Sequence, residues 1–323
     1  MKKLISIIIP AYNEEESLPP CFSRLTKLID GLTSYNFEVL LVDDGSKDCT
    51  AKLAKAKHAA DKRFHYLSLS RNFGKEIAMM AGMDYSHGDA VIFIDADLQD
   101  PPELIPKLIE YWEQGYDDVY AKRRSRRGET WLKKWTSRMY YRVLQSATRV
   151  EIQKDTGDFR LLDRRCINAL IQMRESSRNS KSMFSWIGYK KKEVLYDRDP
   201  RIAGQTKWNY LRLVDLAIDG ITSFTTSPLR LATILAIPTF ILFVGYFIYV
   251  IIKSIVIALP IQAFQAIILL VLFFSGVNIL LFGIIGEYLG RIFKESKARP
   301  LYFIDEHDGQ KETNSLASPK ASK

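Results

Sequence analysis

Short apolar runs alternate with helical segments along the first hundred residues of the chain. The helical segments, at residues 14–32, 48–60 and 75–85, carry apolar side chains at helical spacing. The runs between them are rich in β-branched residues, as expected of strands buried on both faces of a parallel sheet. These runs are Leu4–Ile9, Phe37–Val42, Phe64–Leu69 and Ala90–Ile94. The alternation predicts an α/β fold in which helices cover both faces of a parallel sheet.

The last third of the chain has a different pattern, because two long spans carry no charged residue. Leu231–Ile252 has 22 residues and Ile261–Ile285 has 25, and both exceed the length of about 20 residues that crosses a membrane. Ahead of them, Tyr210–Phe224 is amphipathic, which is typical of a helix lying at a membrane interface. Lys and Arg gather on both sides of the pair, whereas the connection carries only Lys253, so we expect both ends in the cytoplasm.

These patterns divide the chain into four parts. We expect a cytoplasmic α/β domain at residues 1–208, an amphipathic helix at 209–228, a two-helix transmembrane hairpin at 229–286, and a cytoplasmic segment with a disordered polar tail at 287–323. The apolar stretch at the N-terminus is too short for a signal peptide, so the first domain should stay in the cytoplasm. Three widely separated cysteines form neither a metal spacing nor a disulfide framework, which fits a reducing compartment.

Basic residues outnumber acidic ones, and the formal net charge is +9. The excess is concentrated at Lys122–Arg142, where nine Lys or Arg accompany one acid, Glu129, with tryptophans and tyrosines among them. Such a stretch can bind nucleic acid, an anionic lipid surface or a phosphorylated substrate. The apolar spans and the acidic motifs described next argue against nucleic acid as the partner.

Acidic residues follow three of the predicted strands at the point where each strand ends. Asp95-Ala-Asp97 follows the apolar residues Val91–Ile94, and Gln99 comes shortly after. Two carboxylates at this spacing can share one Mg²⁺ or Mn²⁺ ion that also contacts substrate phosphates, with the Gln99 amide oxygen as a third ligand. The other two strand ends carry Pro10–Glu14 and Asp43–Ser46. Alone, such motifs also occur in solvated turns and helix caps. Together they indicate a binding site, because ligands of parallel sheets bind beyond the carboxyl ends of the strands.

In order and spacing, these motifs resemble those of family-2 glycosyltransferases with the GT-A fold. The resemblance rests on Pro10-Ala-Tyr-Asn-Glu14, Val42-Asp-Asp-Gly-Ser46, Asp95-Ala-Asp-Leu-Gln-Asp-Pro-Pro-Glu103, Gly157-Asp-Phe-Arg-Leu161 and Arg201-x-x-Gly-x-Thr-Lys-Trp208. Up to about residue 304 the chain resembles bactoprenol (undecaprenyl phosphate) glucosyltransferases, relatives of dolichol-phosphate mannose synthase. Thr206 stands where that family often has Ser, and the Gln-x-x-Arg-Trp motif of processive polysaccharide synthases is absent. The resemblance implies a Rossmann-like nucleotide-sugar domain followed by the membrane hairpin.

The resemblance also implies roles for individual residues. The nucleotide-sugar would contact Pro10, Tyr12, Glu14 and Asp44, with Arg201 and Lys207 on a loop that closes over its diphosphate. Lys75 would shape the same pocket, although it could equally be only the start of a helix. Asp95, Asp97 and Gln99 would hold the metal, and Arg123, Lys133 and Lys134 would bind the phosphate of the lipid acceptor. Cations on both sides of the two phosphate groups would reduce their repulsion and stabilise the departing UDP.

Asp158 and Asp97 are the residues expected to take part in the chemical step. Inverting transfer usually needs a base that deprotonates the attacking oxygen, and Asp158 is the first candidate, with Asp155 the second. A phosphate monoester is already largely dianionic at neutral pH, so Asp158 could instead orient the acceptor or a cation. The four histidines show no pairing or ligand spacing in the sequence, and we expect none of them to be catalytic.

We therefore expect an inverting hexosyltransferase that moves glucose from UDP-glucose to undecaprenyl phosphate, giving a lipid-linked donor for cell-envelope glycans. UDP-GlcNAc, UDP-GalNAc, GDP-mannose and UDP-aminoarabinose stay open as donors, because no residue decides the sugar. We expect a homo-oligomeric, multi-pass protein of the bacterial inner membrane that contacts the lipid bilayer, with its catalytic domain and both termini cytoplasmic. A flippase component or membrane scaffold is the alternative class, but two spans alone enclose no polar path, and the acidic strand ends would be unexplained.

Overall fold

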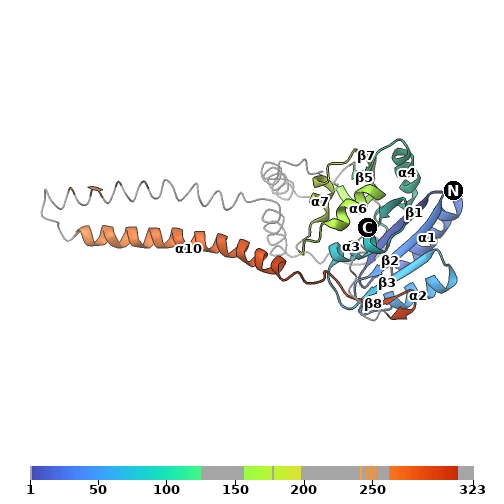
Figure 1. Ribbon diagram of the computed structural model, residues 1–323, viewed down its shortest axis with the longest axis horizontal. Helices are drawn as coiled ribbons and strands as arrows, with labels where there is room; N and C mark the ends of the chain where they lie inside the picture. The colour runs from blue at the N-terminus through green and yellow to red at the C-terminus, as the bar shows by residue number, and fades with distance from the viewer. Residues whose placement is uncertain are drawn as a thin grey trace, which may run out of the picture. The chain divides into compact units, whose positions relative to one another are not determined.

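The computed structural model describes residues 2–124, 156–176, 178–197, 241, 245, 248, 249, 252 and 262–311. The chain divides into two compact units, one formed by residues 1–145, 150–210 and 300–323, and the other by residues 146–149 and 211–299. In the described part of the chain, the first unit contains a nine-stranded sheet in the order β7-β5-β6-β4-β1-β2-β3-β8-β9 (Figure 1).

Four parallel strands form the centre of this sheet and confirm the four strands predicted from the apolar runs. They are β1 (Leu4–Ala11), β2 (Asn36–Asp43), β3 (Phe64–Leu69) and β4 (Ala90–Phe93). In the register of the sheet, Ile7 of β1 lies opposite Val39 of β2 on one side and Ile92 of β4 on the other. All three side chains are fully buried, which explains why these runs are apolar at successive positions instead of alternating.

Helices cover both faces of the central strands (Figure 1). They are α1 (Leu18–Gly31), α2 (Thr50–Ala60), α3 (Lys75–Tyr85), η1 (Pro102–Leu104), α4 (Ile105–Glu113), α6 (Arg164–Gln172) and α7 (Ser180–Trp186). On one face, Leu18 and Leu25 of α1 join Ile7 in a buried cluster. On the other, α3 approaches so closely that a Cβ at Gly82 would lie 2.5 Å from Ile8 Cγ2. The predicted helical segments are therefore confirmed, with α1 beginning four residues later than expected.

Beyond β4 the sheet continues with strands that the apolar pattern did not predict. These are β5 (Asp118–Arg123), β6 (Thr156–Asp163) and β7 (Lys191–Tyr196). β6 runs antiparallel to both β4 and β5, and β7 runs parallel to β5. A buried ion pair holds β5 and β6 together, with Arg160 Nη1 3.1 Å from Asp118 Oδ2 and both side chains fully buried. Breaking such a pair would leave an uncompensated charge in the core, so it strongly favours this register.

The chain returns to the sheet after residue 299, which the sequence pattern did not predict. β8 (Ile304–His307) pairs antiparallel with β3, and β9 (Gln310–Lys311) pairs with β8. Asp308 and Gly309, at φ values of 47° and 88°, form the two-residue turn of this hairpin, and such turns need positive φ at both positions. The hydroxyl of buried Tyr302 donates to Asp84 at 2.6 Å and anchors the returning segment. Residues 312–323 lie outside the described residues.

The predicted multi-pass location in a bacterial inner membrane is wrong for the part of the chain that the structure describes. No helix among those residues combines the length and the apolar character that a membrane crossing requires. The predicted span at residues 261–285 falls almost entirely within α10 (Gln262–Ser296), a helix of 35 residues. The amphipathic segment at 209–228 and most of the span at 231–252 lie outside the described residues.

Candidate active site

The topology brings the ends of six strands together at one edge of the sheet, the edge at which the parallel strands β1, β2 and β4 end. β1, β2 and β4 are parallel and end there. β6 begins there because it runs antiparallel to β4, and β5 and β7 end there because both run antiparallel to β6. Side chains at this edge therefore come from positions that are far apart in sequence. They include Tyr12, Asp44, Asp95, Arg123, Asp158 and Tyr196.

Lys75 forms the centre of the candidate site. Its ammonium lies 2.6 Å from Asp95 Oδ1, at the end of β4, and 2.6 Å from Asp158 Oδ2, at the start of β6. The register explains the meeting, since Phe93 pairs with Arg160, and two further residues along each strand place Asp95 beside Asp158. Burial alone would lower the pKa of Lys75, but the two carboxylates outweigh it and raise that pKa above its ordinary value. Lys75 is therefore a permanent cation between two acids.

Asp158 is an ionised carboxylate, and one of its oxygens accepts no hydrogen bond from the described residues. Burial alone would raise its pKa, but the charge of Lys75, followed by those of Lys181 and Arg160, lowers the pKa to about 2. Its Oδ2 contacts Lys75, whereas its buried Oδ1 has no hydrogen-bond partner among the described residues. A buried oxygen without a partner is costly, so Asp158 Oδ1 is a place where a bound ligand or cation would be stabilised.

The segment after Asp95 turns back sharply. Leu98 has a φ of 54°, a backbone conformation that a leucine adopts only under constraint from its surroundings. The amide N–H of Gln99 donates to Asp97 Oδ1 at 3.2 Å, and Asp97 is only 9% exposed. The turn therefore keeps Asp95, Asp97 and Gln99 at one end of β4, where their oxygens offer the hard ligands that Mg²⁺ or Mn²⁺ requires.

Arg123, at the end of β5, lies beside the same edge. Burial alone would lower its pKa, but a hydrogen bond with Tyr196 and the charge of Asp100 raise that pKa, so the guanidinium stays charged. The Tyr196 hydroxyl in turn donates to Asp100. A Cβ added at Gly157 would lie 3.5 Å from Arg123 Nη2 and 3.8 Å from Asp100 Oδ2. Arg123 Nε is buried and has no partner among the described residues, which leaves a donor for an anion.

The ends of β1 and β2 are joined by hydrogen bonds. The Asn13 N–H donates to Ser46 Oγ, and the Glu14 N–H donates to Thr50 Oγ1, each at 2.9 Å. Pro10 lies in β1 opposite Val42. Tyr12 is 42% exposed, so its ring is available to a ligand.

Asp44, which the motif predicts to line the nucleotide pocket, is bound to the backbone of a neighbouring loop. Its side chain is buried, and its two oxygens accept the N–H groups of Phe73 at 2.7 Å and Gly74 at 2.8 Å. Burial raises the pKa of this carboxyl, although both hydrogen bonds oppose the rise. Gly45, at φ 67°, lets the two loops meet, because a Cβ there would lie 2.4 Å from the Arg71 carbonyl carbon. Asp44 thus fixes the loop that delivers Lys75.

The structure brings together many of the residues that the sequence singled out. Asp95, Lys75 and Asp158 are in direct contact, and Arg123 lies at the same edge. Lys133, Lys134, Asp155, Arg201 and Lys207 lie outside the described residues. Sequence reasoning missed the partnership of Asp100 with Tyr196, and nothing near Tyr196 in the sequence signals it. Asp100, by contrast, belongs to the acidic motif that follows β4.

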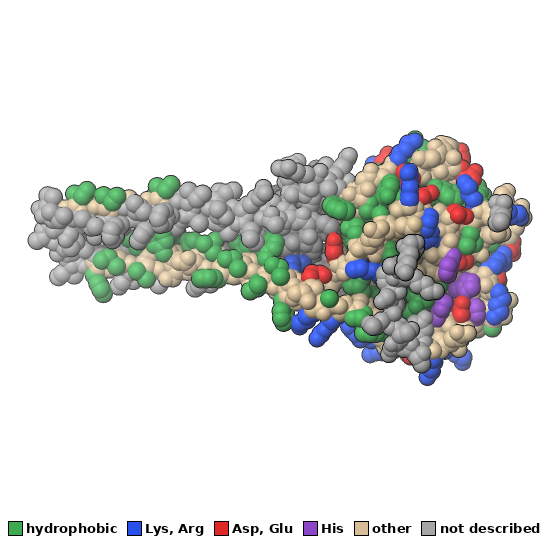
Figure 2. Space-filling model, in the orientation of Figure 1, with side chains coloured by type: hydrophobic (Ala, Val, Ile, Leu, Met, Phe, Trp, Pro, Cys, Tyr) green, Lys and Arg blue, Asp and Glu red, His purple; other side chains and the backbone are tan. Residues whose placement is uncertain are grey.

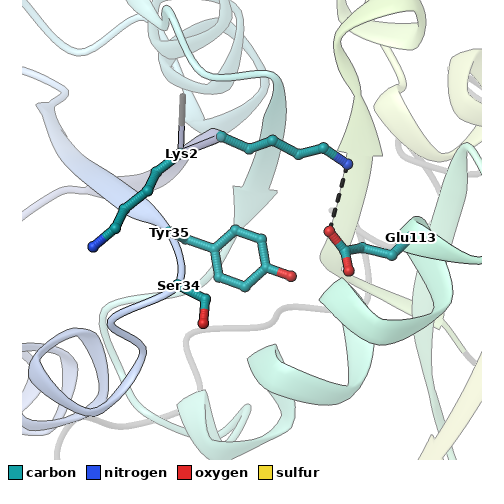
Figure 3. Close-up of a pocket in the computed structure, with 5 residues that line it drawn as sticks. Lys2, Ser34, Tyr35 and Glu113 are labelled. Atoms are coloured by element: carbon teal, nitrogen blue, oxygen red, sulfur yellow. Dashed lines mark hydrogen bonds and ion pairs between the residues drawn. The ribbon is translucent and has the colours of Figure 1, made fainter.

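A hollow at the opposite edge of the sheet is a separate feature (Figure 3). It is lined by Lys2, Lys3, Ser34, Tyr35 and Glu113, beside the first residues of β1 and β2. The Lys3 ammonium lies 3.4 Å from Glu113 Oε1 across it. None of the motifs singled out in the sequence contributes to this hollow.

Comparison with known proteins gives a consistent picture. The model of glycosyl transferase family 2 matches residues 6–171. An uncharacterized glycosyltransferase of Synechocystis sp. is 47% identical over 302 residues, covering 94% of this chain and 95% of that protein. An uncharacterized glycosyltransferase of Bacillus subtilis is 42% identical over 94% of each chain. A bactoprenol glucosyl transferase of Shigella phage SfX is 39% identical over 93% of this chain and 98% of that protein.

The chain is also similar to a solved structure, at a lower sequence identity. The glucosyl-3-phosphoglycerate synthase of Mycobacterium tuberculosis, in complex with Mn²⁺, UDP-glucose and phosphoglyceric acid, aligns with a TM-score of 0.47 and 18% identity. The alignment covers 68% of this chain and 78% of that protein.

Proposed function

The chain belongs to glycosyl transferase family 2 and is a glycosyltransferase, and on that premise we propose that it transfers glucose from UDP-glucose to undecaprenyl phosphate with inversion. The observation that carries this proposal is the contact of Lys75 with Asp95 and Asp158, at the same end of the sheet as Arg123. This end of the sheet offers cations and metal ligands to two phosphorylated substrates. The acceptor follows from the near full-length similarity to a protein named bactoprenol glucosyl transferase.

The donor would occupy the ends of β1 and β2. Pro10, Tyr12 and Glu14 line this end, and the exposed ring of Tyr12 can stack on the uracil base. Asp44 supports the pocket from behind, because both of its oxygens are already bound to backbone N–H groups. Arg201 and Lys207, outside the described residues, would complete the diphosphate site as the family resemblance implies.

Asp95, Asp97 and Gln99 would hold a Mg²⁺ or Mn²⁺ ion beside the donor diphosphate. Oxygen ligands suit these ions. Lys75 lies between Asp95 and Asp158, which indicates that the two carboxylates attract positive charge. When bound, the metal supplies neutralisation of the diphosphate and of the negative charge that builds up on the leaving UDP. Lys75 would share that work through its own positive charge.

Arg123 would grip the acceptor phosphate. Its partly buried guanidinium is held by Tyr196, and its unused Nε can donate to a phosphate oxygen. Charge-assisted hydrogen bonds to phosphate are worth about 1.5–3 kcal/mol. Lys133 and Lys134 belong to the same basic stretch of the sequence and would add to the attraction.

Asp158 suits a positioning role better than that of a general base. A carboxylate with a pKa of about 2 is a weak proton acceptor at neutral pH. The acceptor phosphate has a second pKa near 6, so it attacks as a dianion and no proton has to be removed. In the transfer, a phosphate oxygen forms the bond to the anomeric carbon while the bond to the UDP oxygen breaks with its electron pair. Asp158 would hold Lys75 and, through its second oxygen, orient a cation.

The test is incubation of purified protein with undecaprenyl phosphate, Mn²⁺ and a panel of radiolabelled nucleotide-sugars. We expect label from UDP-glucose to enter the lipid fraction and UDP to be released in equal amount. Transfer from UDP-GlcNAc, UDP-GalNAc, GDP-mannose or UDP-aminoarabinose instead would keep the reaction and change the sugar. Absence of transfer from every donor to undecaprenyl phosphate would overturn the proposed acceptor.

A further inference from the structure

Three of the four histidines in the chain gather around one carboxylate, although the sequence shows no ligand spacing among them. His65 Nδ1 lies 2.6 Å from Asp308 Oδ2, and His58 Nδ1 lies 3.6 Å from Asp308 Oδ1. His307 Nε2 lies 3.7 Å from Asp308 Oδ2. Histidine side chains with acidic atoms among them form a visible group on the face shown in Figure 2. The group contains none of the residues assigned above to sugar transfer.

The fold holds these side chains in place from three directions. His58 lies on α2, His65 is the second residue of β3, and Asp308 occupies the turn between β8 and β9. The Tyr66 N–H donates to Asp308 Oδ1 at 2.9 Å, and the Asp308 N–H donates to the Tyr66 carbonyl at 3.2 Å. Because these bonds and the hairpin turn fix Asp308, its carboxylate cannot swing away from the imidazoles.

We propose that His58, His65 and Asp308 form a binding site for a divalent transition-metal ion, with Zn²⁺ as the best fit. One ligand atom from each residue lies within 4.8 Å of the others. Bonds of about 2.0–2.2 Å to nitrogen and oxygen place the ligands of tetrahedral zinc about 3.3–3.6 Å apart, so small side-chain rotations are enough. Two imidazoles with one carboxylate favour Zn²⁺ over Mg²⁺, which prefers oxygen ligands alone.

The surroundings match what a zinc site needs beyond its ligands. The Tyr66 N–H orients the carboxylate of Asp308, as outer hydrogen bonds do in metal sites. The side chains of His58, Asp308 and His65 are 16%, 22% and 36% exposed, so an ion can enter from solvent. His307 or a water molecule can take a fourth position. His58 Nδ1 now lies 2.7 Å from the Phe64 carbonyl oxygen, and metal binding through this nitrogen would replace that hydrogen bond.

This site is distinct from the candidate active site. His65 lies near the beginning of β3, whereas the acidic motifs lie beyond the carboxyl ends of the parallel strands. Its ligands come from segments separated by 243 residues in sequence, so a bound ion would cross-link the returning hairpin to α2 and β3. We therefore assign the ion a structural role, in which it stabilises the outer strands β8 and β9 against the rest of the sheet.

The experiment uses the full chain, freed of metal by chelation and then supplied with ZnCl₂ in the presence of excess MgCl₂. We expect one tightly bound Zn²⁺ per chain by elemental analysis after dialysis, and a Tm that rises when Zn²⁺ is added. His65→Gln and His58→Gln should each weaken Zn²⁺ binding by at least about tenfold, the scale on which even outer-shell changes act. Asp97→Asn should leave this binding unchanged, which separates the site from the proposed catalytic metal.

The fourth histidine supplies a matched control. His87 has a side chain that is 76% exposed and lies 3.5 Å from Glu38, so His87→Gln should bind Zn²⁺ as the wild type does. Equal weakening in His87→Gln and His65→Gln would mean that the ion binds surface imidazoles in general, which would overturn the proposal. Failure of the wild type to retain Zn²⁺ would overturn it as well. The Tm of each metal-free variant reports whether the variant folds. If His65→Gln does not fold, Zn²⁺ binding by His58→Gln tests the proposal.

Discussion

Replacing Lys75 with methionine should tighten metal binding and slow sugar transfer at the same time. The substitution keeps a long side chain but removes the charge that lies 2.6 Å from both Asp95 and Asp158. At present the ammonium occupies an oxygen of Asp95 that a metal would need. It would also repel a divalent ion at that position. Without it, Asp95 is released to the metal, while Asp158 loses the partner that holds it.

The size of the effect follows from the distances. Two contacts of 2.6 Å leave the two carboxylate oxygens at most about 5 Å apart, and two unit charges at that distance repel by about 3 kcal/mol at an effective dielectric constant of about 20. The Lys75 side chain is 42% exposed, so solvent screening lowers this repulsion between the carboxylates to about 1–2 kcal/mol. A free-energy change of about 1.4 kcal/mol is a factor of about ten, so we expect Mn²⁺ to bind about tenfold more tightly to Lys75→Met.

The assay is titration of each protein with Mn²⁺, followed by the electron paramagnetic resonance of the free ion, alongside transfer rates at saturating Mn²⁺. Lys52→Met, an exposed position on α2, is the control for loss of one positive charge at the surface. We expect Lys75→Met to show the lower dissociation constant and the lower kcat, and Lys52→Met to match the wild type. Mn²⁺ binding that is unchanged or weaker in Lys75→Met would refute the reasoning, because Lys75 would then not compete for Asp95.

Three further outcomes are expected. EDTA should abolish transfer, and Asp97→Asn should reduce kcat by at least about a hundredfold, the scale of losing a major charge-stabilising group; full activity in EDTA would contradict this. Arg123→Ala should raise the KM for undecaprenyl phosphate about tenfold or more and leave UDP affinity unchanged, and the opposite pattern would move Arg123 to the donor site. Because the pKa of Asp158 is lowered to about 2, its contribution of about 2 kcal/mol is present above pH 4 and is lost as pH falls towards 2. Urea midpoints between pH 5 and pH 2 should therefore fall less in Asp158→Asn than in the wild type.

The central strands could be predicted because their signal is local. β1 and β2 are buried on both faces, so nearly every position is apolar and each strand is visible within one short window. β5 and β6 gave no such signal, because polar side chains such as Asp118 and Arg160 lie inside them and are stabilised by each other. In the sequence, a charged residue that pairs with a residue of another strand cannot be told from a charged loop residue until the strand pairing is known.

The same distinction explains the site. Asp95 and Asp97 stand in one motif, so a metal-binding role could be predicted for them from spacing alone. The contact of Lys75 with Asp158 spans 83 residues, and the contact of Tyr196 with Asp100 spans 96, so both depend on strand order, which no short window contains. The histidine group around Asp308 is the extreme case, because its ligands meet only when the end of the chain joins β3.

The membrane prediction rested on span length and charge asymmetry alone. Of the predicted span 261–285, residues 262–285 lie within α10, which extends to Ser296. Among the described residues no helix meets the requirement for crossing a membrane.

A single electrostatic arrangement links the fold to the proposed chemistry. Antiparallel β6 places Asp158 opposite Asp95, and two carboxylates so close would repel strongly unless a cation lay between them. The chain supplies that cation itself as Lys75, at the end of a loop that Asp44 holds through two backbone N–H groups. One of the two carboxylate charges is thus compensated before any substrate arrives. If Asp95 holds the metal as proposed, it would give up its contact with Lys75, and the ammonium would then face the phosphates whose repulsion the enzyme must overcome.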